Sequence, residues 1–168
     1  MQGHAFFLRP DIPKKGVPAD IRYDEEEGFL AEPLRSYAVD AGLVMRRPSL
    51  TPYSVYALEA TEYAQEQGCF DTFHRATYKA LWEDDKDLGD LSVIQEIANA
   101  CGLNWPELHQ RLESGHYKAV LEAQFQQAVD LGIQGIPAFA MGNVLFTGAQ
   151  PYQVFQEAAR QTLHRRES

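Results

Sequence analysis

The most constraining feature of this 168-residue sequence is the segment GIQGIP, Gly132 to Pro137, which separates two hydrophobic patterns. Before it, apolar residues recur at helical spacing from Tyr117 to Ala128, and after it the pattern alternates as in a strand. Proline cannot donate to a sheet ladder, so it is tolerated only at a strand's first residue, an edge or a bulge. The segment therefore predicts a helix that ends at Gly132 and a strand that Pro137 begins.

The residues after Pro137 predict a β-hairpin and a final helix. Residues 138–141 and 144–147 alternate as strands around Gly142-Asn143, a pair typical of a two-residue primed turn. Pro151 suits the first turn of a helix. The apolar face expected for that helix comprises Val154, Phe155, Ala158, Ala159 and Thr162.

The rest of the chain predicts one short strand followed by a block of helices. The apolar run AFFL, residues 5–8, predicts a strand buried on both faces. The remaining expected elements are a helix over about 29–42, an extended stretch 43–50, a helix capped by Thr51 and closed by Gly68, a helix over 70–82, a helix with a Ser92/Gln95 capping box, a helix with an Asn104/Glu107 capping box that ends at Gly115, and a long helix to Gly132. Helices against a small mixed sheet make an α/β architecture.

Composition and charge exclude some partners. The net charge of −9 repels phosphate backbones and anionic membranes, so we expect no nucleic acid and no membrane as partner. The start, MQGHAFFLRPD, lacks a basic n-region, and its apolar run stops at Arg9, unlike a signal peptide. We therefore expect a cytoplasmic protein.

The cysteines do not indicate redox chemistry. Cys69 and Cys101 are 32 residues apart and form no CxxC. Cys101 shares an apolar helix face with Ile94, Ile97 and Ala98, a setting that keeps a thiol inert. Cys69 lies near a helix start, which has better electrostatics for a thiolate, but the sequence shows no resolving partner in reach. No histidine or acidic pattern predicts a metal site.

Several stretches together resemble the DsbA-like family, in particular its FrnE-type branch. They are FFLRPDIPKKG at residues 6–16, LEATEYAQEQG at 58–68, FHRATYKALW at 73–82 and GIQGIPAFAMGNVLFTGAQPYQVF at 132–155. The resemblance implies an α/β, thioredoxin-like fold with a large α-helical insertion. It implies a single domain over 1–168, with 1–29 and 116–168 as the thioredoxin-like part and 30–115 as the insertion.

The resemblance also implies a binding site. In the family, the proline that matches Pro137 follows a cis peptide bond, and the residue before it offers its backbone to an extended thiol or peptide substrate. The expected substrate-binding residues are Gly135, Ile136 and Pro137, with Arg9 and Pro10 beside the cleft. A trans proline that begins an edge strand is the alternative.

The sequence departs from the family at its start. Met1 lies where the family's second strand begins, so the resemblance implies that the first β-α unit, which carries the CxxC, is lacking. We therefore expect no catalytic residue and no dithiol exchange, although the lineage is that of thiol-disulfide oxidoreductases. The alternatives are a glutathione-dependent 2-hydroxychromene-2-carboxylate isomerase-like enzyme, with glutathione as substrate and no cofactor, and a non-catalytic thiol- or peptide-binding module.

A missing central strand has consequences for pairing. In the fold that the chain resembles, the first strand lies between the strands that match AFFL and AFAM. Open strand edges recruit other strands. We therefore expect either a homodimer or direct pairing of residues 5–8 with Ala138 to Met141. A longer, monomeric protein of which this is an incomplete record is the alternative.

Overall fold

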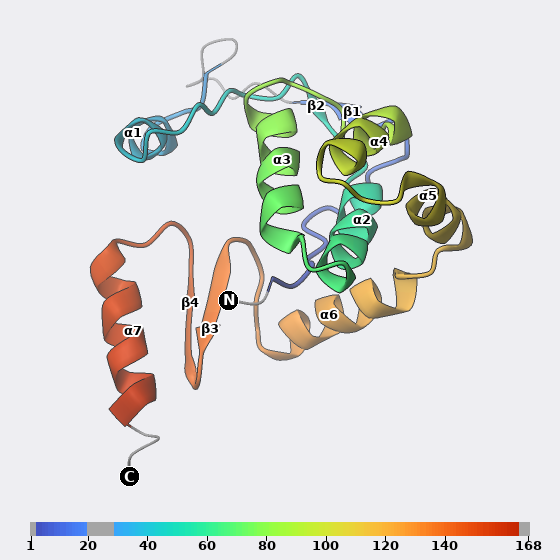
Figure 1. Ribbon diagram of the computed structural model, residues 1–168. Coiled ribbons are helices and arrows are strands. Elements are labelled where there is room, and N and C mark those ends of the chain that lie inside the picture. Colours follow the sequence, from blue (N-terminus) through green and yellow to red (C-terminus); the bar gives the residue numbers. More distant parts are fainter. Residues whose placement is uncertain (1–2, 20–28, 165–168) are drawn as a thin grey trace. The chain divides into compact units, whose positions relative to one another are not determined.

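The computed structural model describes residues 3–19 and 29–164, and the chain divides into two compact units (Figure 1). The helical unit comprises Arg9–Ala119, and the hairpin unit comprises Met1–Leu8 with Val120–Ser168. The prediction of a single domain with an insertion over 30–115 stays a prediction.

The helical unit contains five helices and a minimal antiparallel ladder among its described residues. The ladder joins β1 (Val17–Pro18) to β2 (Leu50–Thr51), with Val17 opposite Thr51. The helices are α1 (Leu34–Asp40), α2 (Val55–Glu66), α3 (Phe70–Trp82), α4 (Leu91–Ala100) and α5 (Trp105–Ser114).

The core of the helical unit lies between α2, α3, α4 and α5. Tyr63, Phe73, Ile94 and Leu108, one from each of these helices, are almost or fully buried in one hydrophobic cluster. Small residues on α2 let the neighbouring helices approach, and Ala60 is fully buried there. The apolar face predicted for Ile94, Ile97 and Ala98 is thus buried on α4.

Helix boundaries confirm some sequence predictions and correct others. The predicted helix over 70–82 is α3, and the Asn104 side chain caps α5 by accepting the Glu107 N–H at 3.4 Å. The predicted helix over 29–42 is wrong in length, because α1 spans only Leu34–Asp40. Two caps were also misassigned, at Thr51 and at Ser92.

Each misassigned cap has a physical reason. Thr51 pairs in β2, so α2 begins later, after Ser54. The carboxylate of Asp90 accepts the Ser92 N–H at 2.8 Å and caps α4, so the helix begins at Leu91 and Ser92 lies within its first turn.

The hairpin unit is built on one β-hairpin and two helices. It contains most of α6 (Lys118–Asp130), then β3 (Ala138–Met141), β4 (Val144–Thr147) and α7 (Tyr152–His164). The hairpin confirms the prediction: β3 pairs antiparallel with β4 through a two-residue turn. Gly142 adopts φ +60°, which glycine allows at the first position of a primed turn.

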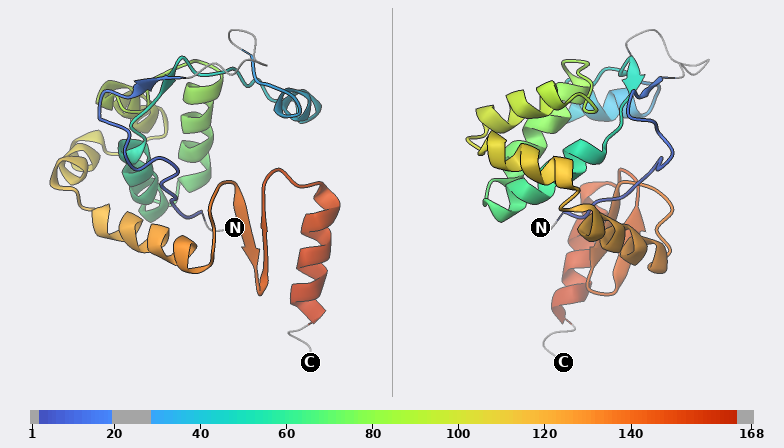
Figure 2. Two further views of the ribbon diagram at one scale, coloured as in Figure 1. Left: turned by 180° about the vertical axis from the view of Figure 1, so that it is seen from behind. Right: turned by 90° about the vertical axis from the view of Figure 1, so that its right-hand side faces the viewer.

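One face of the hairpin packs on α7, which runs alongside the two strands in the left view of Figure 2. Phe139 and Phe146, opposite each other in the ladder, contact Phe155 with ring centroids 4.8 and 4.9 Å away. The Thr162 hydroxyl adds a hydrogen bond to the Met141 carbonyl at 3.0 Å. These aromatic contacts fix the helix against the two strands.

The predicted strand over residues 5–8 is wrong. The segment is irregular and lies on α6 instead, where Phe6 and Phe7 contact Phe125 with centroids 5.2 and 5.4 Å apart. The Ala5 N–H donates to Gln124 Oε1 at 2.6 Å. Direct pairing with β3 is also wrong, because in the described chain β3 pairs with β4 alone. The rings of Phe6 and Phe7 pack against α6, so this segment has apolar contacts without pairing as a strand. The homodimer stays a prediction.

No helix among the described residues has the length and apolar character that crossing a membrane requires.

Candidate functional site

The loop before β3 begins where α6 ends. Gly132 takes φ +76°, a backbone conformation that residues with a side chain rarely adopt, and the helix ends there. The Ile133 N–H still reaches back to the Ala128 carbonyl at 2.9 Å. The following residues, Gln134 to Pro137, run free of helix and strand.

Pro137 joins this loop to the hairpin. The peptide bond between Ile136 and Pro137 is cis, as the sequence analysis predicted. The Pro137 carbonyl accepts the Gly148 N–H at 2.8 Å, so the loop is tied to the residue that follows β4. Because β4 is held by β3 and by α7, the hairpin and α7 together position the loop.

An open hollow of about 330 Å³ lies at this loop. Ile136 is 50% exposed there, and a Cβ placed on Gly135 would meet no other heavy atom within 4 Å. In the described part of the chain, no hydrogen bond engages the backbone of Gln134, Gly135 or Ile136. The residues that line the hollow are Gly132, Gln134, Gly135, Ile136, Pro137, Thr147 and Gly148.

The lining residues determine what this hollow can do chemically. None of the seven carries an ionisable side chain, and none is a cysteine. The hollow therefore offers backbone donors and acceptors, one exposed Ile136 side chain, the amide of Gln134 and the hydroxyl of Thr147. Such a surface can bind an extended chain, but it supplies no thiol and no ionisable acid or base of its own.

Arg9 and Pro10 belong to the helical unit, and both are exposed. The Arg9 carbonyl accepts the Ile12 N–H at 3.5 Å in a turn. Their predicted place beside the loop of Gly135, Ile136 and Pro137 stays a prediction.

The structure brings together two residues that the sequence analysis kept apart. Cys69 and Cys101 are both free and half-buried, and both pack against the core cluster of the helical unit. Burial raises the pKa of the Cys101 thiol, as its apolar helix face predicted, and the nearby Cys69 raises it further. The separation of 32 residues in the sequence had hidden this proximity.

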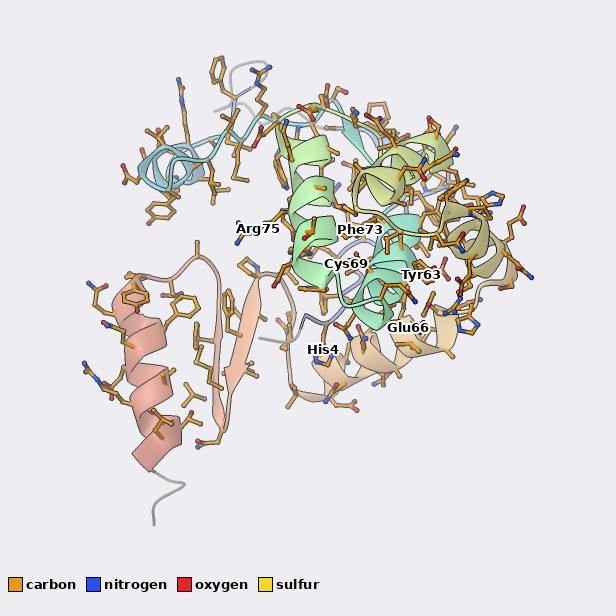
Figure 3. All side chains as sticks on the ribbon, viewed as in Figure 1. His4, Tyr63, Glu66, Cys69, Phe73 and Arg75 are labelled. Atoms are coloured by element: carbon orange, nitrogen blue, oxygen red, sulfur yellow. The ribbon has the colours of Figure 1, made fainter. Side chains whose placement is uncertain are left out.

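A charged network between α2 and α5 was also missed by the sequence analysis. Arg111 donates to Glu66 at 2.6 Å, to the Tyr117 hydroxyl at 2.6 Å and to Glu107 at 2.7 Å. The Tyr63 hydroxyl donates to the same Glu107 carboxylate at 3.0 Å. Figure 3 labels Tyr63 and Glu66 on α2. Burial, then hydrogen bonding to Glu66, raises the pKa of Tyr117 to about 12. The network therefore links α2, α5 and Tyr117 through hydrogen bonds to Arg111 and Glu107.

The sequence profile of the DSBA-like thioredoxin domain family matches residues 1–160. The chain belongs to this family. The match accounts for the thioredoxin-like α/β fold, in which helices predominate and the strands are short. Substrate binding at Gly135, Ile136 and Pro137, which the resemblance implied, stays a prediction.

Two similar proteins are longer than this DSBA-like chain. An uncharacterized protein, YwbO of Bacillus subtilis (strain 168), is 23% identical over 128 residues, which cover 74% of this chain and 64% of the relative. A probable DsbA oxidoreductase from Streptomyces coelicolor superposes with a TM-score of 0.72 at 25% identity, over 77% of this chain and 57% of that structure. This DSBA-like chain therefore spans less than two thirds of the length of either relative.

Proposed function

We propose that this chain binds an extended, thiol-containing polypeptide at Gly135, Ile136 and Pro137, as a DsbA/FrnE-like member of the thiol-disulfide oxidoreductase lineage that does not itself catalyse dithiol exchange. The observation that carries the proposal is the unpaired backbone of Gln134, Gly135 and Ile136 at an open hollow. Its lineage is supported by the family match and by the probable DsbA oxidoreductase that the chain resembles.

Backbone recognition follows from what the loop leaves free. Ile136 has one N–H and one C=O, and an extended peptide can pair with both in the way that a strand adds to a sheet edge. Gly135 lets the peptide backbone approach closely, because no side chain stands there. The half-exposed side chain of Ile136 supplies apolar contact for a neighbouring peptide residue.

Catalysis of exchange needs groups that the hollow lacks. Thiol-disulfide exchange requires an attacking thiolate and a thiol that resolves the mixed disulfide. No cysteine lines the hollow, and the sequence holds no CxxC. Binding without turnover is therefore the function that this surface supports.

The hollow favours a peptide over glutathione as the bound thiol. Glutathione carries two carboxylates, and anion binding calls for Lys, Arg or several converging N–H donors. The lining residues include no Lys or Arg. Glutathione as substrate of an isomerase-like enzyme thus has less support than a peptide. The proposed protein is cytoplasmic and associates as a homodimer. It uses no cofactor and binds no nucleic acid.

Gly135→Leu should weaken peptide binding at least about tenfold, because the new side chain fills the space that the peptide backbone must enter. Folding should persist, since a Cβ at Gly135 meets no atom within 4 Å. The measurement is a nuclear magnetic resonance titration with a blocked synthetic peptide that carries one cysteine between apolar residues. The amides of Gly135, Ile136 and Gly148 should shift on binding to the wild type.

Ala123→Leu is the matched control, because it adds the same side chain at an exposed position of α6. It should bind the peptide like the wild type. A peptide with serine in place of cysteine separates thiol recognition from backbone recognition. Equal binding by Gly135→Leu and the wild type, or shifts confined to residues elsewhere, would contradict the proposal.

The purified protein should fail to accelerate the reduction of insulin by dithiothreitol above the uncatalysed rate. The reason is that no cysteine lines the hollow and that Cys69 and Cys101 form no CxxC pair. The measurement is the turbidity of the precipitating insulin B chain. Turnover that disappears in Cys69→Ser would show that this expectation is wrong.

A further inference from the structure

The sheet of the hairpin unit has an outer edge on β3 and another on β4 (Figure 1). In the described chain each of these strands pairs only with the other. Along an antiparallel strand, residues whose backbone groups face the partner alternate with residues whose backbone groups face away. Every second residue of each strand therefore directs its N–H and C=O groups out of the sheet.

The turn and one hydrogen bond identify the outward-facing residues of β3. A two-residue turn is closed by a hydrogen-bonded pair, so the backbone of Met141, the last residue before the turn, faces β4. Such pairs recur at every second position, and the bond from the Gly148 N–H to the Pro137 carbonyl at 2.8 Å falls in this series. The backbone groups of Ala138 and Ala140 therefore face away from β4.

The edge of β3 is open, whereas the edge of β4 is partly occupied. On β4 the Thr147 carbonyl faces away from β3 and accepts the side-chain amide of Gln150 at 2.7 Å. Among the described residues, no hydrogen bond outside the ladder engages the backbone of Ala138 or Ala140. Lysine, proline or a bulge often protects an exposed strand edge, and β3, with the sequence AFAM, contains none of these. The outer edge of β3 is thus suited to accept another strand.

This edge continues directly from the loop to which we assign peptide binding. Only Pro137, which has no N–H, lies between Ile136 and Ala138. A peptide held at Ile136 is already beside the edge of β3, so pairing there is an intramolecular step with a high effective concentration. This continuity favours the peptide over a second copy of the chain as the strand that pairs with β3.

We propose that the outer edge of β3 is part of the peptide-binding site and that the bound polypeptide pairs there as an added antiparallel strand. This inference rests on the proposed peptide binding at the loop. Ala138 and Ala140 each donate an N–H and offer a C=O to the peptide residue opposite. The peptide residue between these two positions directs its own N–H away from β3. Pairing of this kind needs no charged side chain on the protein, and no charged residue lines the hollow beside β3.

The first test uses the wild-type protein and the blocked cysteine peptide. A series of peptides carries a single N-methyl group, moved by one residue from each peptide to the next. Methylation of an N–H that faces β3 removes a hydrogen bond and places a methyl group against the strand, so it should weaken binding at least about tenfold. Methylation at the positions between should leave binding unchanged. The expected result is an affinity that alternates along the series.

The same series separates this inference from the proposed function. Sensitivity at a single peptide position, without alternation, would overturn pairing along β3 and would leave binding at the loop intact. Failure of the unmodified peptide to bind would overturn both. In the wild type with bound peptide, the amides of Ala138 and Ala140 should exchange at least about tenfold more slowly than without it. Protection that appears without peptide and increases with protein concentration would show a second copy on this edge and overturn the proposal.

Ala140→Pro tests the edge from the side of the protein. It removes an N–H that faces away from β4, and an edge strand tolerates proline at such a position. Peptide binding should weaken at least about tenfold, because the added strand loses a donor. Leu145→Pro is the matched control, because Leu145 lies opposite Ala140 and its N–H faces away at the other edge. It should bind the peptide like the wild type.

Hydrogen exchange of the Phe139 and Phe146 amides, which face the partner strand, shows whether each proline variant keeps the ladder. The peptide series on the wild type decides the proposal if a variant does not. Equal binding by Ala140→Pro and Leu145→Pro, with both ladders intact, would overturn pairing along β3.

Discussion

Leu108→Ala should lower the free energy of unfolding of the helical unit by about 2–5 kcal/mol. Leu108 lies on α5, is fully buried and packs in the cluster between α2, α3, α4 and α5. Truncation removes its contacts and leaves a cavity that the surrounding helices fill only in part. Both tryptophans, Trp82 and Trp105, belong to this unit, so urea unfolding followed by tryptophan fluorescence reports on it directly.

Leu43→Ala makes the same chemical change in the same unit at an exposed site. The Leu43 side chain is 57% exposed, so its removal should change the free energy of unfolding by no more than about 0.5 kcal/mol. A similar loss in both variants would mean that the cluster around Leu108 is not the core that holds the helices together.

The sequence predicted those elements that local patterns determine. The helix over 70–82 and the two strands around Gly142-Asn143 were placed to the residue, because side-chain period and turn residues act within a few positions. Residues 5–8 failed for the opposite reason. An apolar run of four residues is equally suited to a buried strand and to packing on a helix, and only the tertiary contact with Phe125 decides between them.

The candidate site divides in the same way. The cis bond between Ile136 and Pro137 was predictable because a six-residue motif carries it, whereas a second cis bond, Glu32–Pro33, lies in no such motif and was missed. The proximity of Cys69 to Cys101 could not be predicted, since it arises only when α3 packs on α4. Contacts between residues far apart in the sequence have no local signature.

Phe155→Ala should loosen the hairpin unit and weaken peptide binding together. Phe155 is half-buried on α7 and contacts the rings of both Phe139 and Phe146. Its removal should lower the stability of the unit by about 2–3 kcal/mol, less than for a fully buried phenylalanine because part of the ring is already exposed. Hydrogen exchange of the amides in β3 and β4 measures this change without a signal from the helical unit.

The effect on binding follows from how the loop is held. The Pro137 carbonyl accepts its hydrogen bond from Gly148, the residue that follows β4, so motion of β4 away from α7 also moves the loop. The peptide titration should therefore give weaker binding in Phe155→Ala, by at least about threefold if the bound loop geometry is populated less often. Tyr152→Ala removes another aromatic ring from α7, but that ring is 71% exposed and should change neither exchange nor binding. Faster exchange in β3 and β4 with unchanged peptide binding would contradict this account. It would show that the hydrogen bond between Pro137 and Gly148 positions Ile136 without help from α7.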